Sequence, residues 1–245
     1  MSRRLFLAAL LCTSLSLSLR AAAEDSTDEQ DTSAGLPREY ADYLIASKTL
    51  SPDKKFAVIY PKLELCDDDG KKDATTDRCK DYLVALKPFR ILCPLETKSP
   101  HFQNRSHTGL SADWSNNNSV VLVILASKWG PGDIFLYELH DGQLTRSTNL
   151  LGKVRDLMAP DFLAAKAERF SDFVDFIFEG DGADLFKLEG TDRVRISALA
   201  TSEPKHIGGI KVWDARFEGV WNIPRAKFTS RQVSRMFAGV RKEEE

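Results

Sequence analysis

The chain has 245 residues, with 34 Lys and Arg against 36 Asp and Glu, so its formal net charge is −2 at pH 7. Loss of residues 1–23, the predicted export signal described below, removes three arginines and no acid, and the charge becomes −5. Proteins that hold nucleic acid neutralise phosphates with a basic face. The charge therefore excludes nucleic acid and anionic membrane as main partners.

The first 23 residues have the pattern of a secretory signal. Arg3 and Arg4 precede an apolar run from Leu5 to Leu19, and small residues end at Ala23, where we expect cleavage. The run is short for a membrane span and an acidic segment follows it. No later segment is long and apolar enough to span a membrane. The sequence therefore predicts a periplasmic or secreted protein.

Two details of this signal can be read further. Residues 2–7, SRRLFL, resemble the twin-arginine export motif, although paired arginines also occur in ordinary signals, so both export routes stay open. Cys12 follows the bulky Leu11 and does not fit a lipid-attachment site. It leaves with the signal.

Residues 24–35, EDSTDEQDTSAG, are acidic and polar and carry no apolar anchor, which predicts a disordered linker. The rest, residues 36–245, fits the size of one domain. In that domain SPDKKFAVIYP, residues 51–61, indicates a turn followed by a strand. YLVALKPFRIL, residues 82–92, indicates two short strands around Lys87-Pro88.

The next segments repeat this order. In SADWSNNNSVVLVILASKW, residues 111–129, a Ser-x-Asp turn at Ser111 is expected before a buried strand. Residues 133–150 then form a hairpin with Asp141-Gly142 at its tip, because both positions of such a turn favour positive φ. An internal repeat of hairpin units follows from this comparison.

These stretches resemble the blade motif of TolB-like and WD40-like β-propeller repeats. SPDKKFAVIYP carries most of the resemblance, and SADWSNNNSVVLVI with LYELHDGQL carries it more loosely, over residues 47–150. The chain departs from the family in having Lys54 where the turn glycine is usual, and it is short for a closed ring of blades. The predicted fold class is all-β and mainly antiparallel, either propeller-like or built of stacked hairpin sheets, with two short helices.

The second half mixes helices and strands. Leu163, Ala167 and Phe170 recur at helical spacing, so a helix is expected over residues 161–170. Residues 172–190 indicate a hairpin around Asp181-Gly182, and residues 194–201 and 210–223 indicate strands. Thr229 and Gln232 have capping-box spacing ahead of an apolar stripe, which predicts a terminal helix. The stripe is Val233, Met236, Phe237 and Val240.

Three cysteines remain after export, and two should pair in an oxidising compartment. Cys66 ends one strand and Cys79 begins the next, so the base of the intervening loop brings them together. Cys93 is the alternative partner of Cys79, because the following hairpin returns it to the same place. We favour Cys66 with Cys79, in a structural role.

Catalytic and metal sites have little support. The acids between Asp67 and Asp77, and Glu179, Asp181 and Asp184, fit solvated turns better than an EF-hand frame. No zinc motif, nucleophile elbow, phosphate loop or dinucleotide fingerprint is present, so no metal, cofactor or catalytic residue is assigned. His101 and His107 could meet an acid from a distant strand, which keeps a periplasmic hydrolase as the alternative function.

Aromatic residues give the remaining candidate site. Trp213, Phe217 and Trp221 have even spacing on one predicted strand, so their side chains share a face. Such a face is usually core, packed beneath a helix. If it is exposed, it forms with Arg216 a platform for a protein or an envelope glycan. The functional expectation is a binding or interaction module of the bacterial envelope.

Overall fold

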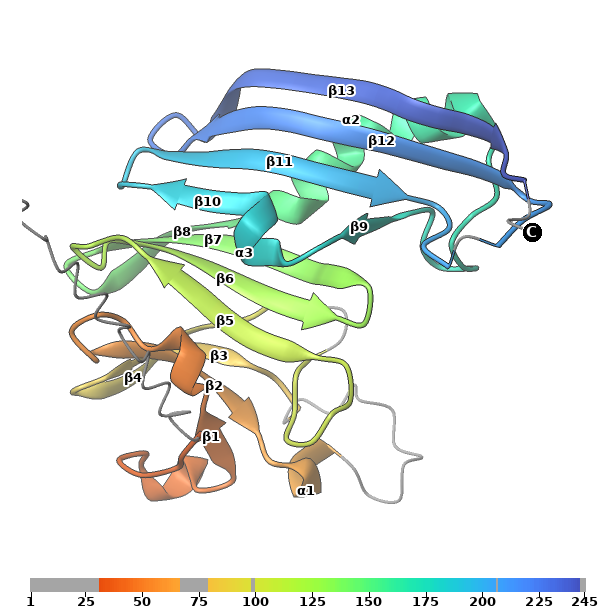
Figure 1. Ribbon diagram of the computed structural model, residues 1–245. Helices are drawn as coiled ribbons and strands as arrows, with labels where there is room; N and C mark the ends of the chain where they lie inside the picture. Colours follow the sequence, from red (N-terminus) through yellow and green to blue (C-terminus); the bar gives the residue numbers. More distant parts are fainter. Residues whose placement is uncertain (1–30, 67–78, 98–99, 206, 243–245) are drawn as a thin grey trace, which may run out of the picture.

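The computed structural model describes residues 31–66, 79–97, 100–205 and 207–242. The predicted signal, residues 24–30 and the acidic loop at 67–78 lie outside these ranges. The chain forms three antiparallel sheets that stack as layers (Figure 1). The predicted all-β, mainly antiparallel class is confirmed.

The sheets follow one another along the chain. The first contains β1 (Tyr43–Ile45), β2 (Phe56–Pro61), β3 (Tyr82–Leu86) and β4 (Phe89–Pro94). The second contains β5 (Gly109–Trp114), β6 (Val120–Ser127), β7 (Gly130–His140) and β8 (Gln143–Asn149). The third contains β10 (Phe186–Glu189), β11 (Arg193–Thr201), β12 (Lys211–Asn222) and β13 (Lys227–Val240), with β9 (Ile177–Glu179) also paired to β11.

Helices are few. A 16-residue helix, α2 (Leu150–Ala165), packs on the inner face of the third sheet, and α1 (Leu63–Cys66) and α3 (Gly182–Leu185) are single turns. Two short 3-10 turns, Arg38–Tyr40 and Ser47–Thr49, flank β1. Among the described residues, no helix has the length and apolar character needed to cross a bilayer.

The second sheet lies between the other two because both of its faces are apolar. In β6, Val121, Val123 and Leu125 belong to the core shared with the first sheet. Val120, Leu122 and Ile124 belong to the core shared with α2 and the third sheet. An uninterrupted apolar run is the sequence signature of a strand buried on both faces.

The turn at Ser51 does recur, but four residues later than expected. The Ser51 hydroxyl accepts the backbone N–H of Phe56 at 3.0 Å, and the Ser115 hydroxyl accepts that of Val120 at 3.0 Å. Lys54 and Asn118 have φ values of 54° and 57° at the matching position. Ser111 lies within β5, so the second turn is Ser-Asn-Asn, residues 115–117. The strands assemble into three separate stacked sheets. This arrangement does not test the likeness to propeller blades, which stays a prediction.

Three expectations for the second half need correction. The helix expected over 161–170 is α2, which begins at Leu150 because Asn149 caps it by accepting the N–H of Gly152 at 2.7 Å. The hairpin expected over 172–190 is wrong, since β9 and β10 pair with different parts of β11 and not with each other. Asp181 instead caps α3, because its carboxylate accepts the N–H of Ala183.

The expected terminal helix is also wrong, because residues 227–240 form β13. This strand pairs with β12 along its whole length, and its apolar residues lie at spacings that fit a helix as well as an irregular strand. Twelve pairings to a buried neighbour outweigh the local propensity.

The predicted linker also ends earlier than Gly35. Thr32 bridges to Ile45, and the Asp31 carboxylate accepts the hydroxyl of Tyr60 at 2.6 Å. These contacts place the last residues of the polar segment in the fold.

The disulfide joins Cys66 to Cys79, with their Cα atoms 5.2 Å apart, and Cys93 is a free thiol. The favoured pairing is confirmed and the alternative with Cys93 is wrong. Burial raises the pKa of the Cys93 thiol to about 11, so it stays protonated at neutral pH.

Replacing both Cys66 and Cys79 with serine should lower the free energy of unfolding by about 3 kcal/mol, because the loop they close spans 13 residues. Urea denaturation of the protein measures this. Cys93→Ser is the control and should cost less. Equal losses in the two proteins would mean that the bridge does not constrain the chain.

Candidate ligand-binding cleft

The aromatic residues singled out in the sequence lie in the core. Trp213, Phe217 and Trp221 are 0%, 0% and 3% exposed and face α2. The Trp213 indole N–H donates to the Asp161 carboxylate at 2.8 Å. Arg216 is exposed on the opposite face of the sheet, beside Glu218. The core interpretation is therefore right, and the exposed platform of these four residues is wrong, because the three rings are covered by the helix and strands packed on them.

The two candidate histidines differ in environment. His107 is exposed in a turn with a φ of 58°. The His101 ring contacts the edge of Tyr60, with 4.6 Å between centroids, and its Nδ1 lies 2.9 Å from the Thr108 hydroxyl. Burial, opposed in part by Asp31, lowers the pKa of His101 to about 4. The ring is neutral at physiological pH.

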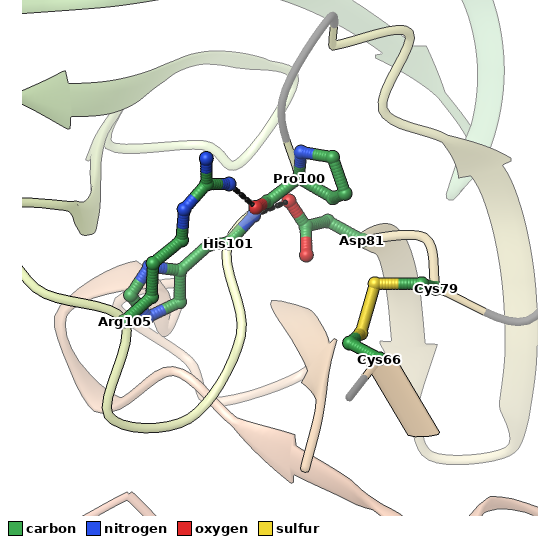
Figure 2. Close-up of a disulfide and its surroundings, with 6 residues drawn as sticks. All are labelled: Cys66, Cys79, Asp81, Pro100, His101 and Arg105. Atoms are coloured by element: carbon green, nitrogen blue, oxygen red, sulfur yellow. Dashed lines mark hydrogen bonds between the residues drawn. A yellow bond between two sulfur atoms is a disulfide. The ribbon is translucent and has the colours of Figure 1, made fainter. Parts of the chain in front are cut away.

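A buried carboxylate lies next to His101 and near the disulfide (Figure 2). Asp81 has no exposed surface, and its Oδ2 accepts the backbone N–H of His101 at 2.9 Å. Its Oδ1 has no hydrogen-bond partner among the described residues. Burial raises the pKa of Asp81 to about 7, although the His101 N–H and the charge of Arg105 lower it in part. The contact of Asp81 is with the backbone of His101, so the imidazole is not paired with this acid.

Asp81 and the nearby loop support the wall of a cleft. The Arg105 guanidinium donates to the carbonyl of Pro100 (Figure 2), and the Thr108 hydroxyl contacts the carbonyl of Arg105 at 3.2 Å. These contacts fix residues 100–108 as a structured loop. Its side chains His101, Arg105 and Thr108 line a hollow of about 510 Å³.

The cleft lies where segments of all three layers meet. Besides the loop from the first layer, it is lined by the β6–β7 turn of the second, the first turns of α2, and residues 173–175 before the third sheet. No single stretch of sequence supplies the site. Stacking of the sheets creates it.

Arg155 supplies one of the two positive charges that line the cleft, the other being Arg105. It donates one hydrogen bond to the carbonyl of Phe176, and its guanidinium carbon lies 5.2 Å from the centroids of both the Phe176 and Phe178 rings. Burial lowers the pKa of this arginine, and the nearby Asp133 and Asp175 oppose that change. No salt bridge to an acid is found for Arg155 within the described ranges. It is a fixed, partly desolvated cation with unused N–H donors.

Three carboxylates and one exposed ring complete the lining. Asp175 is paired with Arg169 at 2.7 Å, Asp133 lies near Asn149, and Asp156 is exposed on α2. Phe173 is 90% exposed, the largest exposed fraction among the big apolar side chains of the described chain. The cleft therefore offers a cation, anions and an apolar surface to one ligand.

Metal binding finds no support in this lining. In the part of the chain that the structure describes, His, Cys, Asp and Glu side chains form no group of three that could hold a metal ion. The acids at 67–77 lie outside the described residues, and Asp181 serves as a helix cap.

Sequence reasoning found His101 but missed Asp81, Arg155 and Phe173. Phe173 was assigned to the hairpin expected over residues 172–190. Arg155 follows the hairpin expected over residues 133–150 and precedes the helix expected over residues 161–170, and no helix was expected between them. The Asn149 cap three residues before Gly152 was the available signal for α2.

Comparison of the chain with family models, with curated proteins and with solved structures gave no match. The function must therefore be inferred from the geometry.

Asp81 should make stability depend on pH in a defined window. Its pKa is raised in the folded state, so its favourable contribution is complete below the unfolded value near 4 and is lost as pH rises to about 7. The slope that one carboxyl group can contribute is at most on the order of 1 kcal/mol for each pH unit in the window. His101, whose pKa is lowered to about 4, contributes the opposite dependence up to about pH 6.5. Asp81→Asn should therefore make stability rise with pH relative to wild type, as measured by urea denaturation between pH 4.5 and 8.

The exposed Asp172→Asn serves as control and should keep the wild-type slope. An unchanged slope in Asp81→Asn would show that Asp81 does not titrate in this range.

Proposed function

We propose that the protein is an exported binding module of the bacterial envelope, and that its cleft holds a zwitterionic ligand, either an amino acid or a short peptide. The signal-like residues 1–23 support export. The Cys66–Cys79 bridge supports an oxidising compartment, periplasmic or extracellular.

The observation that carries the proposal is the state of Arg155. Its guanidinium donates to the Phe176 carbonyl, lies beside the Phe176 and Phe178 rings and faces the cleft. It has no bonded carboxylate among the described residues. A planar guanidinium with unused donors matches a carboxylate, which it can bind through two hydrogen bonds. A carboxylate is also singly charged, and the surrounding acids would repel a more highly charged anion.

The acids and the exposed ring define the rest of the ligand. Asp156 lines the cleft, is exposed and suits an ammonium group. Phe173 leaves most of its ring in water, and covering it with an apolar side chain would contribute on the order of 1 kcal/mol or more. A short peptide carries all three groups, which fits the expected protein-type partner better than a glycan.

A hydrolase remains the competing function, and the geometry around His101 supports it less. The ring contacts Thr108 and not a carboxylate, and a pKa of about 4 makes it a weak base. Ser127 also lines the cleft, but its hydroxyl donates to the carbonyl of Gly130. A nucleophile, base and acid in contact are not seen among the described residues.

Calorimetric titration with the tripeptide Ala-Leu-Ala tests the proposed function. We expect binding with free termini, and a loss of about tenfold or more in affinity when the C-terminus is amidated, because a charged hydrogen bond contributes about 1.5–3 kcal/mol. Arg155→Gln should give the same loss for the free peptide. Phe173→Ser, at an exposed position, should reduce affinity about threefold to tenfold.

Arg38→Gln removes an exposed charge from the first layer and should bind as wild type. Equal affinity for the free and amidated peptides would remove the role assigned to Arg155. Cleavage of the peptide that disappears in the His101→Ala, His107→Ala double variant would replace the binding module with the hydrolase.

A further inference from the structure

Strand β13 forms a long open edge of the third sheet. It has 14 residues and lies at the end of the strand order, where β12 is its only strand neighbour within the described ranges (Figure 1). Register shifts occur at both ends of the segment Ser230–Arg235, which itself pairs regularly with β12. An edge strand presents a row of unpaired N–H and C=O groups to which another extended chain can bind.

A groove runs beside this edge, between β13 and α2. Its volume is about 550 Å³, and Trp221, Phe228 and Leu157 provide its apolar lining. The two rings meet edge to face with their centroids 5.0 Å apart. Trp221 is 3% exposed, and its buried indole N–H has no hydrogen-bond partner among the described residues.

The groove is cationic. Lys227 and Arg231 come from β13, and Lys153 comes from α2, where its Nζ lies 5.7 Å from the Trp221 ring. None of the three is paired with an acid in the part of the chain described. Asp156 is the single acid in the lining, and β13 itself carries none. Arg235 is excluded from this set because it donates two hydrogen bonds to the Asp161 carboxylate.

We propose that the β13 edge binds an acidic, extended peptide segment of a partner protein, which adds a strand to the third sheet. Backbone hydrogen bonds to Ser230–Arg235 provide affinity, and alternate side chains of the added strand face the groove. Its carboxylates meet Lys227 and Arg231, and an apolar side chain packs on the partly exposed Phe228, behind which Trp221 is buried. This surface adjoins the Arg155 cleft, with which it shares only Asp156, and adds a second interaction to the proposed function.

Charge argues against the other occupants of this edge. Two copies paired through β13 about a two-fold axis would bring two strands together that carry only positive charges, and like charges on facing strands are destabilising. An anionic bilayer is disfavoured because the mature chain has a net charge of about −5. An acidic strand meets neither objection.

The test uses the protein without residues 1–23 and the peptide Thr-Glu-Thr-Phe-Thr-Glu-Thr, with both ends blocked, in fluorescence anisotropy at low salt. In this peptide the two glutamates and the phenylalanine share one face of the added strand. We expect saturable binding that weakens with salt, and a loss of about tenfold in affinity for Arg231→Glu and for Lys227→Glu. Trp221→Phe keeps the packed ring but removes the indole N–H, and should weaken binding less. The matched control is Arg38→Glu, which makes the same charge change in the first layer and should bind as wild type.

Three results would overturn the proposal. They are equal binding of the peptide with lysine in place of glutamate, equal binding by Arg231→Glu, and retention of affinity when the two threonines that flank Phe are replaced by proline, which cannot join a sheet edge. Binding of wild type but not Arg231→Glu to vesicles containing phosphatidylserine, with none to the peptide, would assign the surface to lipid. Dimerisation lost in Arg231→Glu would assign it to a second copy. Arg155→Gln should leave peptide binding at this edge unchanged, so that failure of the cleft and failure of the edge can be distinguished.

Discussion

The fold depends on burial of both faces of the second sheet. The run Val120–Leu125 has no polar residue, so alternate side chains of β6 must be covered from two directions. The first sheet covers one face, and α2 with the third sheet covers the other. Burying a side chain of this kind contributes about 1.5–3 kcal/mol. The observed stacking of the three sheets keeps this run from water, and the cleft forms where the connections between them meet.

The wall of the cleft illustrates how a costly group can lie beside a functional surface. Asp81 is fully buried with one oxygen unpartnered, although it binds the N–H of His101. A buried polar group without its full set of partners destabilises a protein, and such groups collect near sites that function has shaped. The disulfide at Cys79, two residues away, keeps the start of β3 in place against this cost.

Much of the fold was predictable from local pattern, and the site was not. Alternation and turn residues located β2, β3, β4, β11 and β12, and the loop between Cys66 and Cys79 gave the disulfide. The turn at Ser115 was misplaced because Ser111-Ala112-Asp113 imitates the first copy more closely in letters than in hydrogen bonding. Arg155 and Phe173 come together only through stacking of layers, which no window of sequence contains.

The error at β13 has a physical origin that also bears on its function. A stripe of Val233, Met236, Phe237 and Val240 suits an amphipathic helix. Residues 210–223 were expected to form a strand, but nothing local indicates that residues 227–240 pair with it. As a strand, the same segment places Lys227 and Arg231 along an open edge. Charged residues at an edge prevent pairing with identical edges, and they do so by repulsion. Because that repulsion reverses for an acidic strand, the residues that protect β13 from other copies of the chain also determine the charge of the strand it can accept.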